Sequence, residues 1–234
     1  MKPYNTVTEL ESLNDLYERK SPEAILAHAL ESDFMNTPCV VSSFGAESVA
    51  LLHMISRINP SITAILVDTG KLFNETLRYR DRIQEKLGLE TVLIVRPRAS
   101  ELKSEDPDGT LHVRSTDDCC DLRKVRVLDR ALAGYGSWIS GRKRYQSIER
   151  STIQILEIDT VGRLKLNPLA NSSGERIRFY IANNDLPMHP LVSEGYPSIG
   201  CLPCTSKVSH GADPRSGRWQ GQNKTECGIH NGPK

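Results

Sequence analysis

Residues 38–57 read PCVVSSFGAESVALLHMISR and combine three elements in one order. The β-branched run at the start indicates a buried strand, the small residues after it indicate a turn, and apolar residues at helical spacing from about 47 to 57 indicate a helix. The same pattern returns as a strand at 63–67, a helix at 73–87 and a strand at 91–95. Because successive strands are joined through helices, the sequence predicts an α/β fold with a mostly parallel sheet.

The flanking sequence extends this fold in both directions. The further elements that we expect are helices at 8–18, 22–32, 117–132 and 174–183, strands at 138–140, 154–158 and 163–166, and a polar connection with loose helical segments at 98–117. From Tyr196 onward glycine, proline, serine and charged residues dominate, without a periodicity that would build a core. We therefore predict an α/β domain at 1–204 and a flexible, site-forming tail at 205–234.

The composition argues against some classes of partner. Thirty basic and twenty-nine acidic residues among 234 leave a formal net charge of +1, so we expect no bulk attraction to nucleic acid or to a membrane. The first twenty residues contain no apolar stretch of the kind found in signal peptides, and no apolar run is long enough to span a bilayer. We expect a cytoplasmic protein in which any basic site is local.

Six cysteines suggest metal or thiol chemistry, because the cytosol keeps thiols reduced and disulfides are rare there. Cys119 and Cys120 are adjacent, and Cys201 and Cys204 form a Cys-x-x-Cys pair in a turn. Four thiolates can bind zinc or anchor an iron–sulfur cluster, and the adjacent pair favours a cluster only narrowly, since neighbouring side chains converge poorly on one ion. Two structural thiol pairs remain the alternative. Cys39 lies in an apolar run and is expected to be a small core residue.

The remaining cysteine, Cys227, stands alone in the sequence ECGIH near the end of the chain. An accessible thiol with cationic neighbours such as Lys224 and His230 favours the thiolate, which is the nucleophilic form. The alternative interpretation is an incidental exposed cysteine.

Two segments have the features of an anion site. Ser42 and Ser43 belong to a small polar turn between a strand and a helix, which either cradles an anion with hydroxyl and N–H groups or is an ordinary connection. Residues 141–150 read GRKRYQSIER and place four cations at the end of a predicted strand, to which Lys124, Arg215 and Arg218 could add. A solvated basic surface loop is the alternative for this segment.

The ordered set of these motifs resembles the phosphosulfate reductase family, and within it the cluster-containing adenylylsulfate reductases of bacteria. The motifs are SSFGAES, CCDLRKV, GRKRYQS, SIGCLPCT, GRW and ECGIH, and the likeness runs over about residues 35–230. The resemblance implies a Rossmann-like adenine nucleotide α-hydrolase fold, related to the PP-loop pyrophosphatases. Phe44 and Glu47 stand where the ATP-cleaving relatives have glycine and aspartate, which speaks against ATP hydrolysis.

The resemblance also implies roles for individual residues. A 4Fe-4S cluster would be held by Cys119, Cys120, Cys201 and Cys204. The nucleotide site would be lined by Ser42 and Ser43, and the phosphosulfate would be neutralised by Lys124, Arg142, Arg215 and Arg218. Arg142 is a better candidate for a direct ligand than Lys143 or Arg144. For His230 the sequence leaves two roles open, lowering the pKa of the thiol or seating the tail.

The implied reaction is reduction of adenylylsulfate to sulfite and AMP through a Cys227 S-sulfonate, as part of sulfate assimilation and cysteine biosynthesis. Because no second cysteine lies beside Cys227, an external thioredoxin or glutaredoxin would release the sulfite. The alternatives are a reductase of 3'-phosphoadenylylsulfate or of both nucleotides, a PP-loop enzyme that thiolates tRNA, and a non-catalytic zinc module. The sequence leaves a homo-oligomer open.

Overall fold

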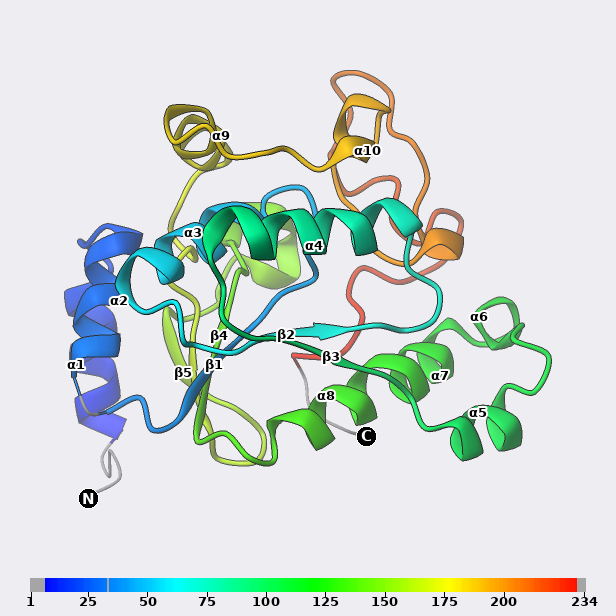
Figure 1. The fold of residues 1–234 in the computed structure, drawn as a ribbon, viewed down its shortest axis with the longest axis horizontal. Helices are drawn as coiled ribbons and strands as arrows, with labels where there is room; N and C mark the ends of the chain where they lie inside the picture. Colours follow the sequence, from blue (N-terminus) through cyan, green and yellow to red (C-terminus); the bar gives the residue numbers. More distant parts are fainter. Residues whose placement is uncertain (1–6, 33, 231–234) are drawn as a thin grey trace.

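The computed structural model describes residues 7–32 and 34–230. Its centre is a six-stranded sheet with the order β3-β2-β1-β4-β6-β5 (Figure 1). The strands are β1 (Pro38–Val41), β2 (Ala64–Val67), β3 (Val92–Val95), β4 (Ser137–Ser140), β5 (Leu156–Ile158) and β6 (Leu164–Leu166). All neighbouring strands are parallel except β5, which runs antiparallel to β6. The expected mostly parallel α/β sheet is therefore confirmed.

Helices cover both faces of the sheet (Figure 1). One layer contains α2 (Pro22–Glu31), α3 (Ser48–Ile58), α4 (Asn74–Leu87) and α9 (Gly174–Asn183). The opposite layer contains α5 (Ala99–Glu105), α6 (Leu111–Arg114), α7 (Thr116–Cys120) and α8 (Arg126–Leu132). Outside the two layers lie α1 (Val7–Tyr17), which packs against β5, and the short α10 (Pro190–Ser193). No helix in the described ranges has the length and apolar character needed to cross a membrane.

Local sequence sets the ends of these helices. Ser21 caps α2, because its side chain accepts a hydrogen bond from the Ala24 N–H at 3.1 Å and Pro22 suits the first helical position. Gly88 ends α4 in the left-handed conformation, with φ of 63°. The expected helices and strands consequently lie within a few residues of their observed bounds.

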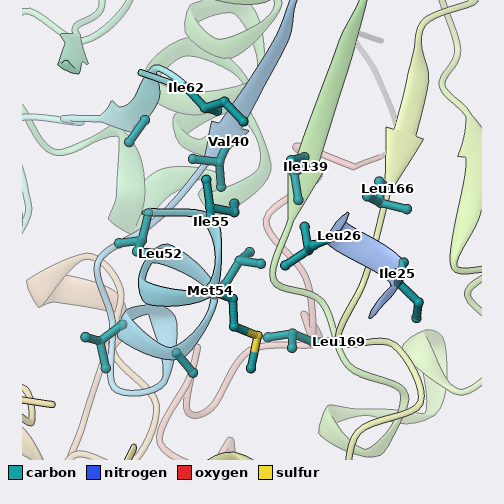
Figure 2. Close-up of a cluster of buried hydrophobic side chains, with 14 of the residues drawn as sticks. Ile25, Leu26, Val40, Leu52, Met54, Ile55, Ile62, Ile139, Leu166 and Leu169 are labelled. Carbon is teal, nitrogen blue, oxygen red and sulfur yellow. The ribbon is translucent and has the colours of Figure 1, made fainter. Parts of the chain in front are cut away.

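The larger core fills the space between the sheet and the layer of α2 and α3. Figure 2 shows Leu26 of α2 pointing toward Ile139 of β4, with Leu52, Met54 and Ile55 of α3 in the same core. A second core lies on the opposite face and comprises Cys39, Ile65, Leu128, Leu132 and Trp138. Cys39 is fully buried there, which confirms its expected place in the core. Burial of each large apolar side chain contributes roughly 1.5–3 kcal/mol.

The helix expected at 117–132 contains a local change of geometry. Between α7 and α8 the backbone forms a π-helical turn at Asp121–Val125, directly after the adjacent cysteines. Such turns are rare and frequent at functional sites. The connection before it is more ordered than expected, since α5 and α6 are held by the buried ion pair between Asp106 and Arg123, 2.5 Å apart.

The segment after Tyr196 is more closely packed than its composition suggests. Trp219 is only 3% exposed, and Thr205 bridges to Arg218, so that this part of the chain folds back on itself. Ile229 packs against the second core. These apolar residues are isolated in the sequence, so they create no periodicity although each is used in packing. Residues 231–234 of the predicted tail lie outside the described residues.

Candidate functional site

The candidate site lies at the carboxyl ends of β1 and β4. These strands are parallel neighbours at the point where the strand order reverses, which is where open α/β sheets bind ligands. The turn after β1 is ordered by Ser42, whose buried Oγ accepts a hydrogen bond from the Phe44 N–H at 3.1 Å. Ser43 is exposed. The structure thus places Ser43 at the surface of the predicted nucleotide turn and Ser42 inside it.

The basic loop after β4 is attached to this turn by one carboxylate. Glu47 accepts hydrogen bonds from the Tyr145 hydroxyl at 2.7 Å and the Gln146 amide at 3.3 Å, and its Oε2 lies 3.1 Å from Nζ of Lys143. Lys143 is only 4% exposed. Arg144 forms a bidentate pair with Glu18. Lys143 and Arg144 are therefore engaged within the protein, in keeping with the expectation that Arg142 is the better ligand candidate.

Arg142 faces the tail. Its Nη1 donates to Glu157 at 3.2 Å, while its buried Nε has no hydrogen-bond partner among the described residues. Burial lowers the pKa of this guanidinium, and the charges of Glu226 and Cys227 lie close enough to oppose that shift. Arg142 consequently keeps one buried N–H donor without a partner among the described residues.

Glu226, the residue before Cys227, is held by two arginines. Arg150 donates from Nε at 2.5 Å and from Nη2 at 2.7 Å, and Arg215 donates from Nη2 at 3.3 Å. Arg215 also donates to the Thr225 carbonyl at 2.7 Å. Burial alone would raise the pKa of Glu226, but the hydrogen bonds and charges of the arginines lower it below its usual value. Sequence reasoning counted Arg150 among the four cations of the basic loop but missed Glu226 and the pairing of the two, because nothing in either motif indicates the other.

The four predicted cluster ligands come together. Cys119, Cys120, Cys201 and Cys204 are buried and line one pocket. They are free thiols. Thr69 Oγ1 lies 3.3 Å from Sγ of Cys201, and the Thr205 hydroxyl donates to the Cys201 carbonyl at 2.8 Å. Within the described ranges no group of three or more histidine, cysteine or acidic side chains is arranged so that it could hold a metal ion. Four buried thiols around one pocket fit the donor set of a multinuclear iron–sulfur cluster.

Cations surround this pocket. Lys124 is partly buried, and although burial lowers the pKa of an ammonium group, the charges of Cys201, Cys227 and Cys120 raise the pKa of Lys124 overall. Arg218 donates from Nε to the Cys204 carbonyl at 3.3 Å and lies over the Trp219 ring, 4.5 Å from its centroid. The pocket can therefore accommodate a negatively charged group.

Cys227 packs against the wall of the same pocket. It is partly buried and packs against the side chains of Cys201, Cys204 and Trp219. Lys124, Arg142 and Arg215 are each close enough to interact with its charge. The structure thus unites the expected nucleophile, the four paired cysteines and the expected cations.

His230 is placed differently from the other predicted residues. Its ring stacks on Trp138 with an interplanar angle of 4° and a centroid distance of 5.7 Å. Burial first, and then the charges of Lys165, Arg142 and Arg150, hold the pKa of His230 well below its usual value. A neutral imidazole supplies no positive charge to a thiolate, so this geometry favours the role of seating the tail.

Known proteins resemble this chain over most of its length. The phosphoadenosine phosphosulfate reductase domain model matches residues 37–207. A Mesorhizobium japonicum protein named adenosine 5'-phosphosulfate reductase is 44% identical over 219 residues, covering 93% of this chain and 85% of that protein. A Gloeobacter violaceus protein named phosphoadenosine 5'-phosphosulfate reductase is also 44% identical, covering 95% and 94%.

The fold has a counterpart among solved structures. The crystal structure of phosphoadenylyl-sulfate reductase from Candida auris, a phosphate complex, has a TM-score of 0.76 at 24% identity and covers 89% of this chain and 100% of that one. This likeness confirms the expected Rossmann-like adenine nucleotide α-hydrolase fold. With the family model matching most of its length, the chain belongs to the phosphoadenosine phosphosulfate reductase domain family.

Proposed function

We propose that this protein reduces adenylylsulfate to sulfite and AMP in the cytosol, with Cys227 as nucleophile and thioredoxin or glutaredoxin as reductant. The observation that carries the proposal is the packing of Cys227 against Cys201, Cys204 and Trp219, in a segment that Arg215 holds through the Thr225 carbonyl and the Glu226 carboxylate. The name of the Mesorhizobium relative supports the choice of substrate.

In this proposal the nucleotide lies at the turn of Ser42 and Ser43, at the strand reversal. The phosphosulfate lies among Lys124, Arg142, Arg215 and Arg218. The Cys227 thiolate attacks the sulfur, a sulfur–sulfur bond forms, and the bond between that sulfur and the bridging oxygen breaks, so that AMP leaves with the electron pair. Cations preorganised around the leaving phosphate stabilise this developing charge.

The second half of the reaction requires an external dithiol. Residues 205–234 contain no cysteine besides Cys227. One thiolate of the partner attacks Sγ of Cys227 and sulfite leaves; the second partner thiol then attacks the mixed disulfide and restores the Cys227 thiol. The two electrons come from the partner, which becomes a disulfide. Residues 205–234 act as a mobile tail in this scheme, and residues 1–204 as the nucleotide- and cluster-binding domain.

A 4Fe-4S cluster would be held by Cys119, Cys120, Cys201 and Cys204, whose four buried thiols share one pocket. A bound cluster supplies a buried charge beside the substrate site. Lys124 interacts with Cys120 and Cys201 as well as Cys227, so it lies where it can stabilise both the thiol pocket and the substrate.

The second candidate is reduction of 3'-phosphoadenylylsulfate. It is favoured by the Gloeobacter relative, which is as similar as the Mesorhizobium protein but is named for the other nucleotide. Competition between the two nucleotides for sulfite release distinguishes the candidates, because an enzyme of one specificity prefers its own substrate by orders of magnitude.

The first experiment is an anaerobic purification followed by a visible spectrum, iron and sulfide analysis, and a sulfite assay with thioredoxin. We expect a brown protein with four irons per chain. Mass spectrometry after mixing with adenylylsulfate, but without thioredoxin, should find a sulfonate on Cys227. A colourless protein that produces no sulfite from either nucleotide would overturn the proposal and leave the family fold alone.

A further inference from the structure

We infer that Glu226 is a positioning residue that seats Cys227 through its ion pair with Arg150, an inference that rests on the proposed role of Cys227. Glu226 precedes Cys227 directly, so their Cα atoms are separated by about 3.8 Å. Whatever fixes the carboxylate of Glu226 therefore limits the positions that the thiol can occupy.

The contact has the form of a strong ion pair. Two nitrogens of Arg150 reach the two carboxylate oxygens of Glu226, at 2.5 Å and 2.7 Å, which is the parallel geometry that a guanidinium favours. The side chains are 11% and 20% exposed, so solvent screens the pair only weakly. Arg150 is in turn bonded to Gln146 in the same loop, so the tail is attached to a loop that is itself attached to the domain.

Charge balance explains why an acidic residue is needed here. Arg142, Arg150 and Arg215 all interact with Glu226, and without its carboxylate three guanidinium groups would face one another. The carboxylate offsets part of this repulsion while leaving Arg142 a buried N–H with no partner among the described residues. Glu226 thus holds the tail through Arg150 and leaves the Nε–H of Arg142 unbonded within the described part of the chain.

The tail has a second attachment on the other side of the thiol. Gly228 turns the chain with φ of 83°, Ile229 packs against the second core, and His230 stacks on Trp138. Cys227 therefore lies between an ionic attachment and an apolar one. Because Glu226 is the neighbour of Cys227 in sequence, a large displacement of the thiol would also draw the carboxylate away from Arg150.

The test compares three variants, Glu226→Gln, Arg150→Met and Arg150→Lys, with Glu194→Gln as a control at an exposed acidic residue. The anaerobically purified protein is treated with iodoacetamide, and alkylation of the Cys227 peptide is followed by mass spectrometry. If only electrostatics changed, removing the negative charge of Glu226 would speed alkylation of Cys227, and removing the positive charge of Arg150 would slow it. The alkylation rates of Glu226→Gln and Arg150→Met would then move in opposite directions. Undocking of the tail raises both rates.

We expect alkylation to be at least tenfold faster in Glu226→Gln and in Arg150→Met, with an intermediate rate in Arg150→Lys, which keeps the charge but loses the fork. For sulfite release, kcat should fall about tenfold in Glu226→Gln while KM changes less than threefold. Thermal unfolding confirms that each variant is folded.

Opposite movements of the two alkylation rates, or no movement in either, would overturn the inference. A lower KM in Glu226→Gln with an unchanged alkylation rate would also overturn it, because the carboxylate would then be competing with the substrate for the arginines. The alkylation assay needs no turnover, so its result is independent of the proposed reaction. A separate experiment tests the proposed reaction: sulfite release by the Cys227→Ser variant would show that Cys227 is not the nucleophile.

Discussion

Replacing Glu47 by Ala removes the carboxylate that joins the nucleotide turn to the basic loop. Lys143 would then keep a buried ammonium group, 4% exposed, without the carboxylate 3.1 Å away. Burial already holds the pKa of Lys143 below its usual value, and the charge of Glu47 opposes that shift. Breaking one side of a buried ion pair typically costs about 3–5 kcal/mol. Glu47 is 22% exposed, so we take the lower end, about 3 kcal/mol.

For a domain of this size, each kcal/mol corresponds to about 2–4 °C in Tm, so we expect a fall of roughly 6–12 °C. Differential scanning calorimetry measures the shift, with Glu194→Ala as the exposed control. The double variant Glu47→Ala with Lys143→Met removes the isolated charge and should recover about half of the loss or more. A fall below about 2 °C in the single variant, or a double variant no more stable than it, would refute the argument from the buried ammonium.

Three further predictions concern other parts of the molecule. Cys227→Ser should abolish sulfite release, while the affinity for adenylylsulfate, measured by equilibrium dialysis, changes less than threefold. Appreciable turnover by this variant would exclude Cys227 as the nucleophile. Trp138→Ala should lower the free energy of unfolding by about 3–5 kcal/mol in urea titrations, because a large aromatic side chain is lost from the core, and a change under about 1 kcal/mol would contradict its packing. Burial lowers the pKa of His189 to about 4 from its ordinary value of 6.5, so the unfolded chain binds a proton that the native chain excludes. The free energy of unfolding should therefore lose about 3 kcal/mol as the pH falls from 6.5 to 4. His189→Gln should not show this part of the loss, and identical pH profiles for the two proteins would count against the assignment.

The elements of the sheet and its main helices could be predicted because their apolar residues are periodic. The strand at 38–41 is a short β-branched run, and the helix at 48–58 has apolar residues at helical spacing. The π-helical turn at Asp121–Val125 could not be predicted in this way. It changes the hydrogen-bond pattern without changing the apolar pattern of the helix that contains it.

The candidate site was predictable in its residue types and less so in its contacts. The paired cysteines indicated a metal or cluster site, because four thiolates can bind zinc or anchor an iron–sulfur cluster, although two separate structural pairs were also compatible with the sequence. Which cations remain available was not predictable, because Glu47 and Glu18 are far in sequence from Lys143 and Arg144. The pair of Arg150 and Glu226 is separated by 76 residues, and only the folded chain brings it together.

The packing of Ile229 and His230 against the second core gives the tail a thermodynamic signature. The core against which Ile229 packs includes Leu128 and Leu132 of α8. If the tail leaves during turnover, as proposed, the apolar surface of Ile229 and Trp138 becomes hydrated, so release carries a positive heat-capacity change. The free energy of docking of the tail must then vary nonlinearly with temperature, and docking must become weaker on cooling, as apolar contacts do. An Arrhenius plot of Cys227 alkylation should bend for the same reason, and it should straighten when Ile229 is replaced by Ser.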